Sequence, residues 1–441
     1  MTRRFQPARA AALVLAAAAG AAALALVAPA QAAPGDLDPS FGHGGIESLK
    51  FPFDVAGPVD AALQPDGRLL VSMALAHAPG ATQSFGLARL RADGGIDTDF
   101  ARNGLAQARF TDFLNTPYAV TPTADGRIVV AGNAESADGT LSEFAVARFL
   151  ANGQPDKSFG RGGRVTTNFV GVHPGGVSNI ATAALALPDG CLLVGGGASQ
   201  CADCTHRTAL ARYLADGALD PAFGDGGMVD VVAIAAPNSL ALLSNGHLLA
   251  LADSAIAEFD ASGMLVTVAS TTTGATIAAQ RHVGNSTWLA DGRFLAAGVA
   301  QGPFGRHDID IQCSRFEPSG NPDVPFQRPV LDFVGAPSGP QPEAPQAIAA
   351  YDDGRFVVGG LAVPAAGETD FGVARLRADG SLDAAFGSGG TVTTVIDDRK
   401  GLQFSFVSAL ALQPDGRVLA AGLAGNHQGR TFLALARYLG N

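Results

Sequence analysis

Residues 181–196 read ATAALALPDGCLLVGG, which is two apolar runs joined by Pro188-Asp189-Gly190. An Asp-Gly pair between two apolar runs is a strong β-hairpin signal, because the central positions of such a turn need positive φ. A run rich in β-branched residues at 164–169 precedes this hairpin, and an apolar run at 209–213 follows it. The stretch therefore predicts four short antiparallel strands connected as a meander.

The same turn recurs along the chain. Its spacing averages about 58 residues, and a repeat of that length indicates one supersecondary unit copied around a ring or along a solenoid. The seven copies are Asp66-Gly67, Asp125-Gly126, Asp189-Gly190, Asn245-Gly246, Asp291-Gly292, Asp353-Gly354 and Asp415-Gly416.

The strands expected in these repeats are apolar on both faces. Phe85 and Leu87 share one face, and Ala88 and Leu90 share the other. A sheet buried on both sides must be stacked between neighbours, and sheets stacked around an axis make a β-propeller. A linear stack would need polar capping repeats, whereas the last repeat is as apolar as the middle ones. We therefore predict an all-β fold, a seven-bladed β-propeller of four-stranded antiparallel blades.

Two motifs strengthen this interpretation. The segments 37–45 (LDPSFGHGG) and 382–390 (LDAAFGSGG) share one pattern, and 371–376 (FGVARL) represents a second that recurs in most repeats. Together with the Asp-Gly-Arg turns, they resemble the delta-60 repeat family of bacterial proteins. The resemblance implies a β-propeller and a family with no established biochemical function.

The N-terminal segment has the composition of a secretory signal peptide. Arg3, Arg4 and Arg9 flank a long apolar stretch, and Ala30-Gln31-Ala32 offers a small-residue cleavage site. We expect residues 1–32 to be removed and residues 33–441 to form a single propeller domain, exported to the periplasm or beyond the cell. The Arg3-Arg4 pair leaves both the general secretory and the twin-arginine routes open. No other segment is apolar for long enough to span a membrane.

The net charge of −11 argues against nucleic acid as a partner. An exported acidic repeat protein is expected to meet an extracellular or envelope protein, a peptide or a glycan. We expect the chain itself to be a monomer.

An arginine follows most of the Asp-Gly turns, and an aspartate comes eight residues after it. We predict structural ion pairs between Arg89 and Asp97, Arg148 and Asp156, Arg212 and Asp220, Arg315 and Asp323, and Arg375 and Asp383.

The ends of the chain supply the remaining pair. Arg437 lacks a following aspartate, and Asp38 lacks a preceding arginine, so pairing the two would close the ring by joining the N- and C-terminal segments. The fourth repeat is short and degenerate: Glu258 replaces the arginine and no matching aspartate segment follows. Arginine and aspartate are therefore lost together, as expected for partners.

The candidate metal ligands are few. Cys201, Cys204 and His206 have ligand types that suit zinc, but an exported pair spaced in this way more often forms a disulfide or stays as thiols. Cys191 and Cys313 lie in strands of different repeats, so we expect buried thiols there. The Asp97-Thr98-Asp99 cluster does not have the spacing of a known calcium loop. We predict no cofactor, with calcium and zinc as the alternatives.

A ligand is expected on one particular face. In a meander, the loops that precede the second strand and follow the third emerge together, and here they differ in length and chemistry. The turns on the opposite face are nearly uniform, so the variable loops are the better binding surface. Their candidate residues are His77, Asp112, His173, His307, Asp308, Asp332, Asp397 and His427.

Three functions remain open. The uniform scaffold with one variable face favours a binding or interaction module. A metal-dependent or hydrolytic enzyme, lactonase-like or lyase-like, would need carboxylates and histidines converging on the central channel. No nucleophile motif, zinc-protease motif or phosphate-binding loop is present in the sequence, so we expect no catalytic residues. The third possibility is a purely structural protein of the cell envelope.

Overall fold

The computed structural model divides into two units, residues 1–32 and 33–441. It describes residues 32–76, 82–169, 177–199, 207–252, 255–270, 286–289, 291–301, 309–319, 321–333, 344–365, 368–396, 402–426 and 429–440. Every element in the described part of the chain is a β-strand of the second unit. No helix among the described residues has the length and apolar character of a membrane span.

Five sheets have four strands each. The first contains β2 (Asp54–Leu63), β3 (Leu69–Ala76), β4 (Gln83–Leu90) and β5 (Leu105–Ala108). The next two contain β14 (Ser239–Leu242), β15 (Leu248–Ala252), β16 (Ala255–Phe259) and β17 (Leu265–Ser270), then β18 (Ser286–Trp288), β19 (Phe294–Gln301), β20 (Ile309–Phe316) and β21 (Val330–Leu331). The last two contain β22 (Ala344–Ala350), β23 (Phe356–Ala365), β24 (Glu368–Leu376) and β25 (Thr391–Thr394), then β26 (Leu402–Leu412), β27 (Val418–Asn426), β28 (Thr431–Tyr438) and β1 (Ile46–Leu49).

A sixth sheet has eight strands. It contains β6 (Asn115–Pro122), β7 (Ile128–Glu135), β8 (Leu141–Phe149), β9 (Arg164–Thr167), β10 (Val177–Ala186), β11 (Leu192–Ser199), β12 (Arg207–Tyr213) and β13 (Met228–Val231). Two four-stranded meanders are joined in it, because β8 and β10 pair in parallel at Leu141–Val177 and Ser142–Ser178.

The all-β propeller is therefore confirmed, and the prediction of seven separate four-stranded blades is wrong as stated: five such blades stand beside the joined sheet. The meander of one sequence repeat is also divided between sheets. Its first strand pairs with the preceding sheet, as β9 does with β8, and its other three strands begin the next one.

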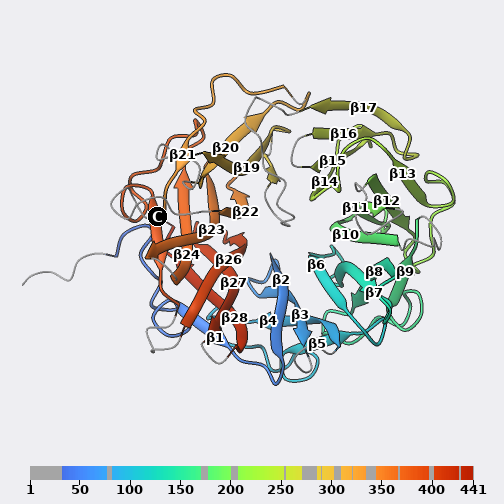
Figure 1. The fold of residues 1–441 in the computed structure, drawn as a ribbon, viewed down its shortest axis with the longest axis horizontal. Coiled ribbons are helices and arrows are strands. Elements are labelled where there is room, and N and C mark those ends of the chain that lie inside the picture. Colours follow the sequence, from blue (N-terminus) through green and yellow to red (C-terminus); the bar gives the residue numbers. More distant parts are fainter. Residues whose placement is uncertain are drawn as a thin grey trace, which may run out of the picture. The chain divides into compact units, whose positions relative to one another are not determined.

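The sheets form a ring in which neighbours pack along their innermost strands (Figure 1). β2 packs against β6, β6 against β10, and so on through β14, β18, β22 and β26, which returns to β2. The ring is closed by a strand from the start of the chain. β1 pairs with β28 in antiparallel register from Ile46–Ala436 to Leu49–Leu433, and Leu37 bridges to Tyr438.

The hydrophobic core lies between adjacent sheets rather than inside any one sheet. At the closing seam, for example, Leu75 of β3 shares a buried cluster with Leu435 of β28. Close approach of strands needs a small residue at particular points. A Cβ on Gly422 would lie 1.9 Å from the carbonyl oxygen of Phe406, beside the bulge between Val407 and Ala409. Gly132 meets the carbonyl of Thr116 in the same way. The repeated glycine therefore accommodates a bulged innermost strand.

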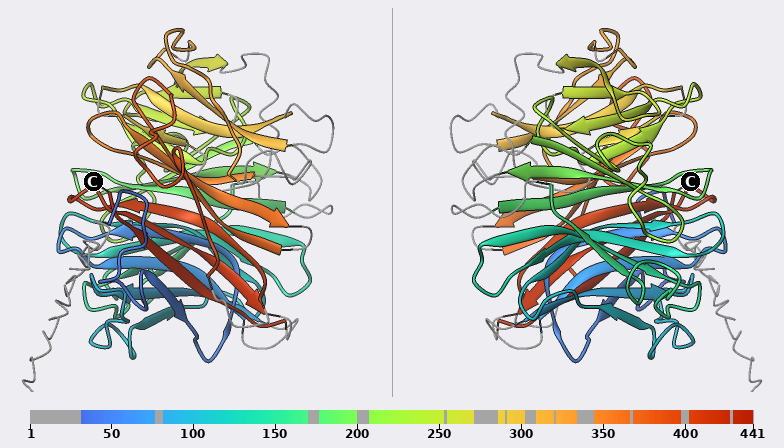
Figure 2. Two further views of the ribbon diagram at one scale, coloured as in Figure 1. Left: turned by 90° about the vertical axis from the view of Figure 1, so that its left-hand side faces the viewer. Right: turned by 90° about the vertical axis from the view of Figure 1, so that its right-hand side faces the viewer.

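Within the unit, the strands run between two opposite faces (Figure 2). We call the face with the turns between the first and second strands of each sheet the Asp–Gly face, and the C-terminus marks it. The second strand of a sheet ends and the third begins at the other face, where the last strand also ends, and we call it the loop face.

Candidate functional site

The charged residues of the Asp–Gly face are arranged in repeated clusters. In each, the Nε of the repeat arginine lies within 3.1 Å of the aspartate Oδ2. Eleven of these twelve residues are buried, and Arg212 is half-buried. The structure brings together Arg89 with Asp97, Arg148 with Asp156, Arg212 with Asp220, Arg315 with Asp323, Arg375 with Asp383, and Arg437 with Asp38.

An aromatic ring covers most of these guanidinium groups. The ring comes from the phenylalanine three residues after the paired aspartate. Its centre lies 4.4–4.8 Å from the guanidinium carbon in five clusters, those of Phe41, Phe100, Phe159, Phe326 and Phe386. The motif therefore supplies both a carboxylate and a cation–π contact to one arginine.

Five of the six arginines also donate a hydrogen bond to a carbonyl of the neighbouring sheet. Nη1 of Arg89 donates a hydrogen bond of 2.6 Å to the carbonyl of Ala151, and Nη1 of Arg212 donates one of 3.2 Å to Ala261. Arg437 bonds in this way to Ala92 across the closing seam. Each of these arginines therefore ties two sheets together, and we call this arrangement the arginine clamp.

A second arginine, directly after the Asp-Gly turn, shares the buried aspartate. Arg417 Nε lies 3.0 Å from Asp38 and Arg127 Nε lies 3.0 Å from Asp156. Burial acts to raise the pKa of Asp38, but hydrogen bonds from Ser40 and the charges of Arg437 and Arg417 outweigh it, so the pKa is lowered. The carboxylate is thus ionised at neutral pH.

Two repeats depart from this pattern. In the third, Cys191 occupies the second-arginine position, and Arg212 bonds to Asp189 at 2.6 Å in addition to its pairing with Asp220. In the fourth, His247 replaces the second arginine and Glu258 the first, and His247 Nδ1 lies 2.7 Å from Glu258 Oε1. The fourth cluster therefore keeps a carboxylate beside a basic side chain, with Glu258 in the first-arginine position in place of the missing aspartate.

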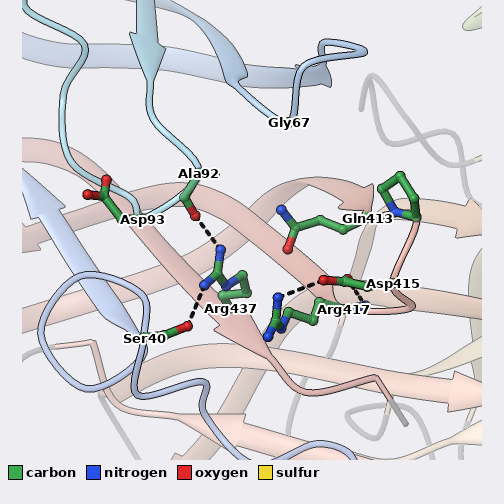
Figure 3. A pocket seen from close by; sticks show the side chains of 9 residues that line it. Ser40, Gly67, Ala92, Asp93, Gln413, Asp415, Arg417 and Arg437 are labelled. Atoms are coloured by element: carbon green, nitrogen blue, oxygen red, sulfur yellow. Dashed lines mark hydrogen bonds and ion pairs between the residues drawn. The ribbon is translucent and has the colours of Figure 1, made fainter.

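A groove of about 460 Å³ lies over the cluster at the closing seam (Figure 3). Arg437 forms its floor, with Nη2 donating to Ser40 at 2.9 Å, while Arg417 bonds to Asp415 at 2.6 Å. The Gln413 Oε1 atom beside them has no hydrogen-bond partner among the described residues. The described lining is Ser40, Gly67, Ala92, Asp93, Gln413, Pro414, Asp415, Arg417 and Arg437.

A second groove, of about 420 Å³, occupies the equivalent place between the meanders of β6–β9 and β10–β13. Arg127, Arg148 and Cys191 are among its lining residues. Burial raises the pKa of the Cys191 thiol, which therefore stays protonated at neutral pH. In both grooves the guanidinium groups already bond to protein acceptors, so the grooves offer hydrogen-bonding edges rather than open anion sites.

Most of the predicted loop-face candidates lie outside the described residues. His77, His173, His307, Asp308, Asp397 and His427 do so, and so do Cys201, Cys204 and His206. Asp112 is exposed and lies 3.3 Å from Arg109, and Asp332 is exposed at the end of β21. Within the described part of the chain, no three His, Cys, Asp or Glu side chains group as a metal site.

Two polar positions were not anticipated from the sequence. Asn115 is fully buried, accepts hydrogen bonds from the N–H groups of Phe110 and Thr111, and donates to the carbonyl of Gln83. Asp60, on the innermost strand β2, accepts hydrogen bonds from the N–H groups of Val120 and Ala61. Burial raises the pKa of Asp60 to about 6 despite these bonds. Asp60 belongs to no recurrent motif, and the asparagine at the position of Asn115 recurs at Asn179, ten residues before the next Asp-Gly turn, but not in the other repeats, so the signal was sparse.

Comparison with known proteins agrees with the fold. Five segments match the family described as domain of unknown function (DUF5122) beta-propeller, namely residues 64–100, 123–159, 187–223, 352–386 and 413–441. These five segments are thus similar to the β-propeller repeats of that family, and the repeats with Asn245 and Asp291 lie outside the matches. No curated protein matches the chain.

Solved structures match the chain at low sequence identity. A protein of unknown function from Dyadobacter fermentans has a TM-score of 0.46 and 10% identity, covering 90% of this chain and 100% of that one. An α-L-arabinofuranosidase of Fusarium graminearum has a TM-score of 0.40 and 10% identity, covering 92% and 96%. A putative gluconolactonase has a TM-score of 0.34 and 13% identity, with the same coverage.

Proposed function

We propose that the chain is an exported binding module that presents its loop face to a partner outside the cytoplasm. The observation that supports this is the difference between the two faces. On the Asp–Gly face the guanidinium groups are committed to carboxylates, rings and carbonyls of the protein itself. Because this arrangement repeats around the ring, we assign it to the stability of the scaffold. The loop face varies between repeats, so we expect recognition to take place there.

The loop-face links differ strongly in sequence. The link after β17 spans residues 271–285, and the one after β11 spans residues 200–206 with two cysteines and a histidine. A rigid ring that carries unlike segments on one side suits a protein, peptide or glycan partner. In this proposal, the joined sheet counts as two blades, residues 1–32 direct export, and no cofactor takes part.

A binding screen tests the proposal. Residues 33–441 would be immobilised and exposed to envelope extract, a peptide library and a glycan array. The double variant Asp112→Ala/Asp332→Ala should weaken capture of the partner at least tenfold. Asp66→Ala/Asp353→Ala, which removes exposed carboxylates from the Asp–Gly face, is the matched control and should bind as the parent does. Equal effects of the two double variants would refute a loop-face site, and failure to capture any partner would favour a purely structural envelope protein.

A hydrolytic enzyme is the second candidate, and Asp60 is the observation that favours it. A carboxyl group with a pKa of about 6 on an innermost strand is suited to general acid–base chemistry near neutral pH. Hydrolysis of a lactone or glycan panel, abolished in Asp60→Asn with unchanged folding, would support this function. Elemental analysis and a thiol count on the same sample would decide whether calcium or zinc is bound and whether Cys201 and Cys204 form a disulfide.

A further inference from the structure

The groove at the closing seam has a filled counterpart one seam earlier in the ring, between the sheet β22–β25 and the sheet that contains β26–β28. There Tyr351 lies two residues before the Asp-Gly turn of its repeat, and its hydroxyl donates a hydrogen bond of 3.0 Å to the carbonyl of Gly416. The guanidinium carbon of Arg355 lies 5.0 Å from the centre of the tyrosine ring. The phenol therefore bridges two adjacent Asp-Gly turns and contacts a cation with its face.

Gln413 occupies the tyrosine position at the closing seam. It too lies two residues before an Asp-Gly turn, and the two turns have the same backbone bonding. Tyr351 N–H donates to the carbonyl of Arg355 at 2.8 Å, and Gln413 N–H donates to the carbonyl of Arg417 at 2.9 Å. The two seams can therefore be compared residue by residue.

The carboxamide of Gln413 does not replace the phenol. Its Oε1 atom is buried and has no hydrogen-bond partner among the described residues. Gly67, the turn glycine that corresponds to Gly416, lines the groove of about 460 Å³ that remains (Figure 3). Arg417, which corresponds to Arg355, lines it too. The closing seam thus keeps the arginine and the turn glycine that hold a phenol at the preceding seam, but it has no phenol of its own.

We propose that this groove binds a phenolic ring, which takes the position that Tyr351 has at the preceding seam. The ring would lie over the guanidinium group of Arg417, and its hydroxyl would donate to the carbonyl of Gly67. The Gln413 carboxamide can move aside, since its Oε1 atom loses no hydrogen bond to a described residue by doing so. The volume of the groove is within the range of small-molecule sites, about 300–1,000 Å³.

The charges around the groove favour a neutral ligand. The guanidinium groups of Arg417 and Arg437 line it together with Asp93 and Asp415, and both also contact the buried carboxylate of Asp38. An anion would therefore meet three carboxylates as well as the two cations. A phenol is uncharged at neutral pH, and it offers one donor and one aromatic face. These are the two features that Tyr351 uses at the preceding seam.

The second groove, between the meanders of β6–β9 and β10–β13, is the alternative position for such a ligand. Thr123 holds the tyrosine position there, but its hydroxyl already donates to Asp125 at 2.6 Å. Leu187 and Leu192 also line that groove, so its wall is more apolar than that of the closing seam. We therefore assign the phenol to the closing seam. This site lies on the Asp–Gly face and does not rest on the proposed loop-face function.

Calorimetric titration of residues 33–441 with p-cresol tests the proposal, and we expect one site per chain. 4-Methylanisole, which keeps the ring but cannot donate a hydrogen bond, should bind about tenfold more weakly. Gln413→Tyr fills the groove from the chain itself and should abolish binding, whereas Thr123→Tyr, the matched control at the second groove, should bind as the parent does. A parent that binds no p-cresol, or binding lost in Thr123→Tyr but kept in Gln413→Tyr, would overturn the proposal.

The reverse substitution tests the comparison of the two seams, and it keeps the proposal testable if Gln413→Tyr does not fold. Tyr351→Gln should open the same groove at the preceding seam, so the number of p-cresol sites per chain should rise from one to two. An unchanged number in the folded variant would show that the arginine and the turn glycine do not hold a phenol, and it would refute the assignment.

Titration with N-acetyl-tyrosinamide distinguishes two sources of the ring. Tighter binding of this compound than of p-cresol would identify the ligand as a tyrosine side chain of a polypeptide. Tighter binding of p-cresol would identify it as a free phenolic compound. Either order requires that Gln413→Tyr abolish the binding of both compounds, and a compound that still binds to this variant would contradict a site in this groove.

Discussion

Asp38 shows how much one residue can contribute to this scaffold. Its carboxylate is 2% exposed, lies 2.9 Å from Arg437 and 3.0 Å from Arg417, and accepts hydrogen bonds from the backbone and side chain of Ser40. Removal of this buried carboxylate takes the charged partner from the guanidinium of Arg437 and one of two carboxylates from that of Arg417.

Asp38→Ala should therefore lower the free energy of unfolding by about 3–5 kcal/mol. Asp99→Ala is a suitable control, because Asp99 lies in the equivalent motif of another repeat but is exposed; it should change stability by less than about 0.5 kcal/mol. Urea denaturation of residues 33–441 measures both. Equal midpoints would show that the closing pair does not stabilise the ring.

The contribution of Asp60 to stability should depend on pH in the opposite sense to that of Asp38. Its pKa is raised from 3.8 to about 6 in the folded state, so the folded protein binds the proton more tightly than the unfolded chain does. Above pH 6 the ionised group destabilises the fold, by about 3 kcal/mol at most. This destabilisation is relieved as the pH falls from 6 toward 4.

Asp60→Asn removes the titration, so its stability profile between pH 4 and pH 7 should lack the rise toward acid that Asp60 contributes to the parent. Urea midpoints at half-unit steps of pH provide the comparison. Parallel profiles would mean that Asp60 titrates normally. Asp38, whose pKa is lowered, contributes stability above pH 3.8 that is lost only in stronger acid, so the two effects occupy separate pH ranges.

At the scale of the strand, the bulged innermost strands explain the repeated glycines. The Gly422→Ala substitution would place a methyl group 1.9 Å from the Phe406 carbonyl, so either the bulge or the β26–β27 pairing must shift. We expect a loss of at least about 2 kcal/mol, in the range of overpacking in a closely packed interior.

Gly139→Ala is the comparison for that substitution. Gly139 has open space around it but a φ of +69°, so alanine there brings only backbone strain, worth about 1 kcal/mol. Thermal unfolding of both variants distinguishes the two mechanisms. A smaller loss for Gly422→Ala than for Gly139→Ala would show that the bulge yields easily.

The elements also show what could be predicted from the sequence. The Asp-Gly turns, the strands around them and the proximity of Arg437 to Asp38 follow from repetition, because identical segments must fold alike. Repetition did not predict which sheet takes the first strand of each repeat. That strand pairs with the preceding sheet, as β9 does with β8, and not with the later strands of its own repeat. The phenylalanine stacked on five of the six arginines, such as Phe41 on Arg437, is part of a visible motif, yet the arginine that it covers lies outside that motif. The extension of β17 along the whole of β16 results from the absence of the aspartate–phenylalanine segment in the fourth repeat. In the sequence, that absence appears only as an irregularity of the repeat.

At the scale of the ring, the arginine clamps make the seams unequal. Across the closing seam, Arg437 bonds to Ala92 and 17 buried residues form one apolar cluster. Between the sheet β14–β17 and the sheet β18–β21, Glu258 occupies the clamp position and cannot donate a hydrogen bond to the next sheet. The described cluster at that seam has five buried residues, among them Leu249, Phe294 and Phe316. Among the described residues, the hydrogen bonding across this seam and its apolar cluster both contribute less to stability than they do at the closing seam.

We therefore expect the ring to open first at the seam between β14–β17 and β18–β21. Opening there needs no clamp to break and exposes the smaller apolar cluster, so its free energy should be the lowest in the ring. Native-state hydrogen exchange should show the amides of β15, β16 and β19 exchanging before those of β3 and β27. The variant Arg89→Ala, which removes the clamp to Ala151, should accelerate exchange at the seam between β2–β5 and β6–β9 and leave the other seams unchanged. Uniform exchange around the parent ring, or a uniform response to Arg89→Ala, would show that the ring opens as one cooperative unit and that the clamps do not set local stability.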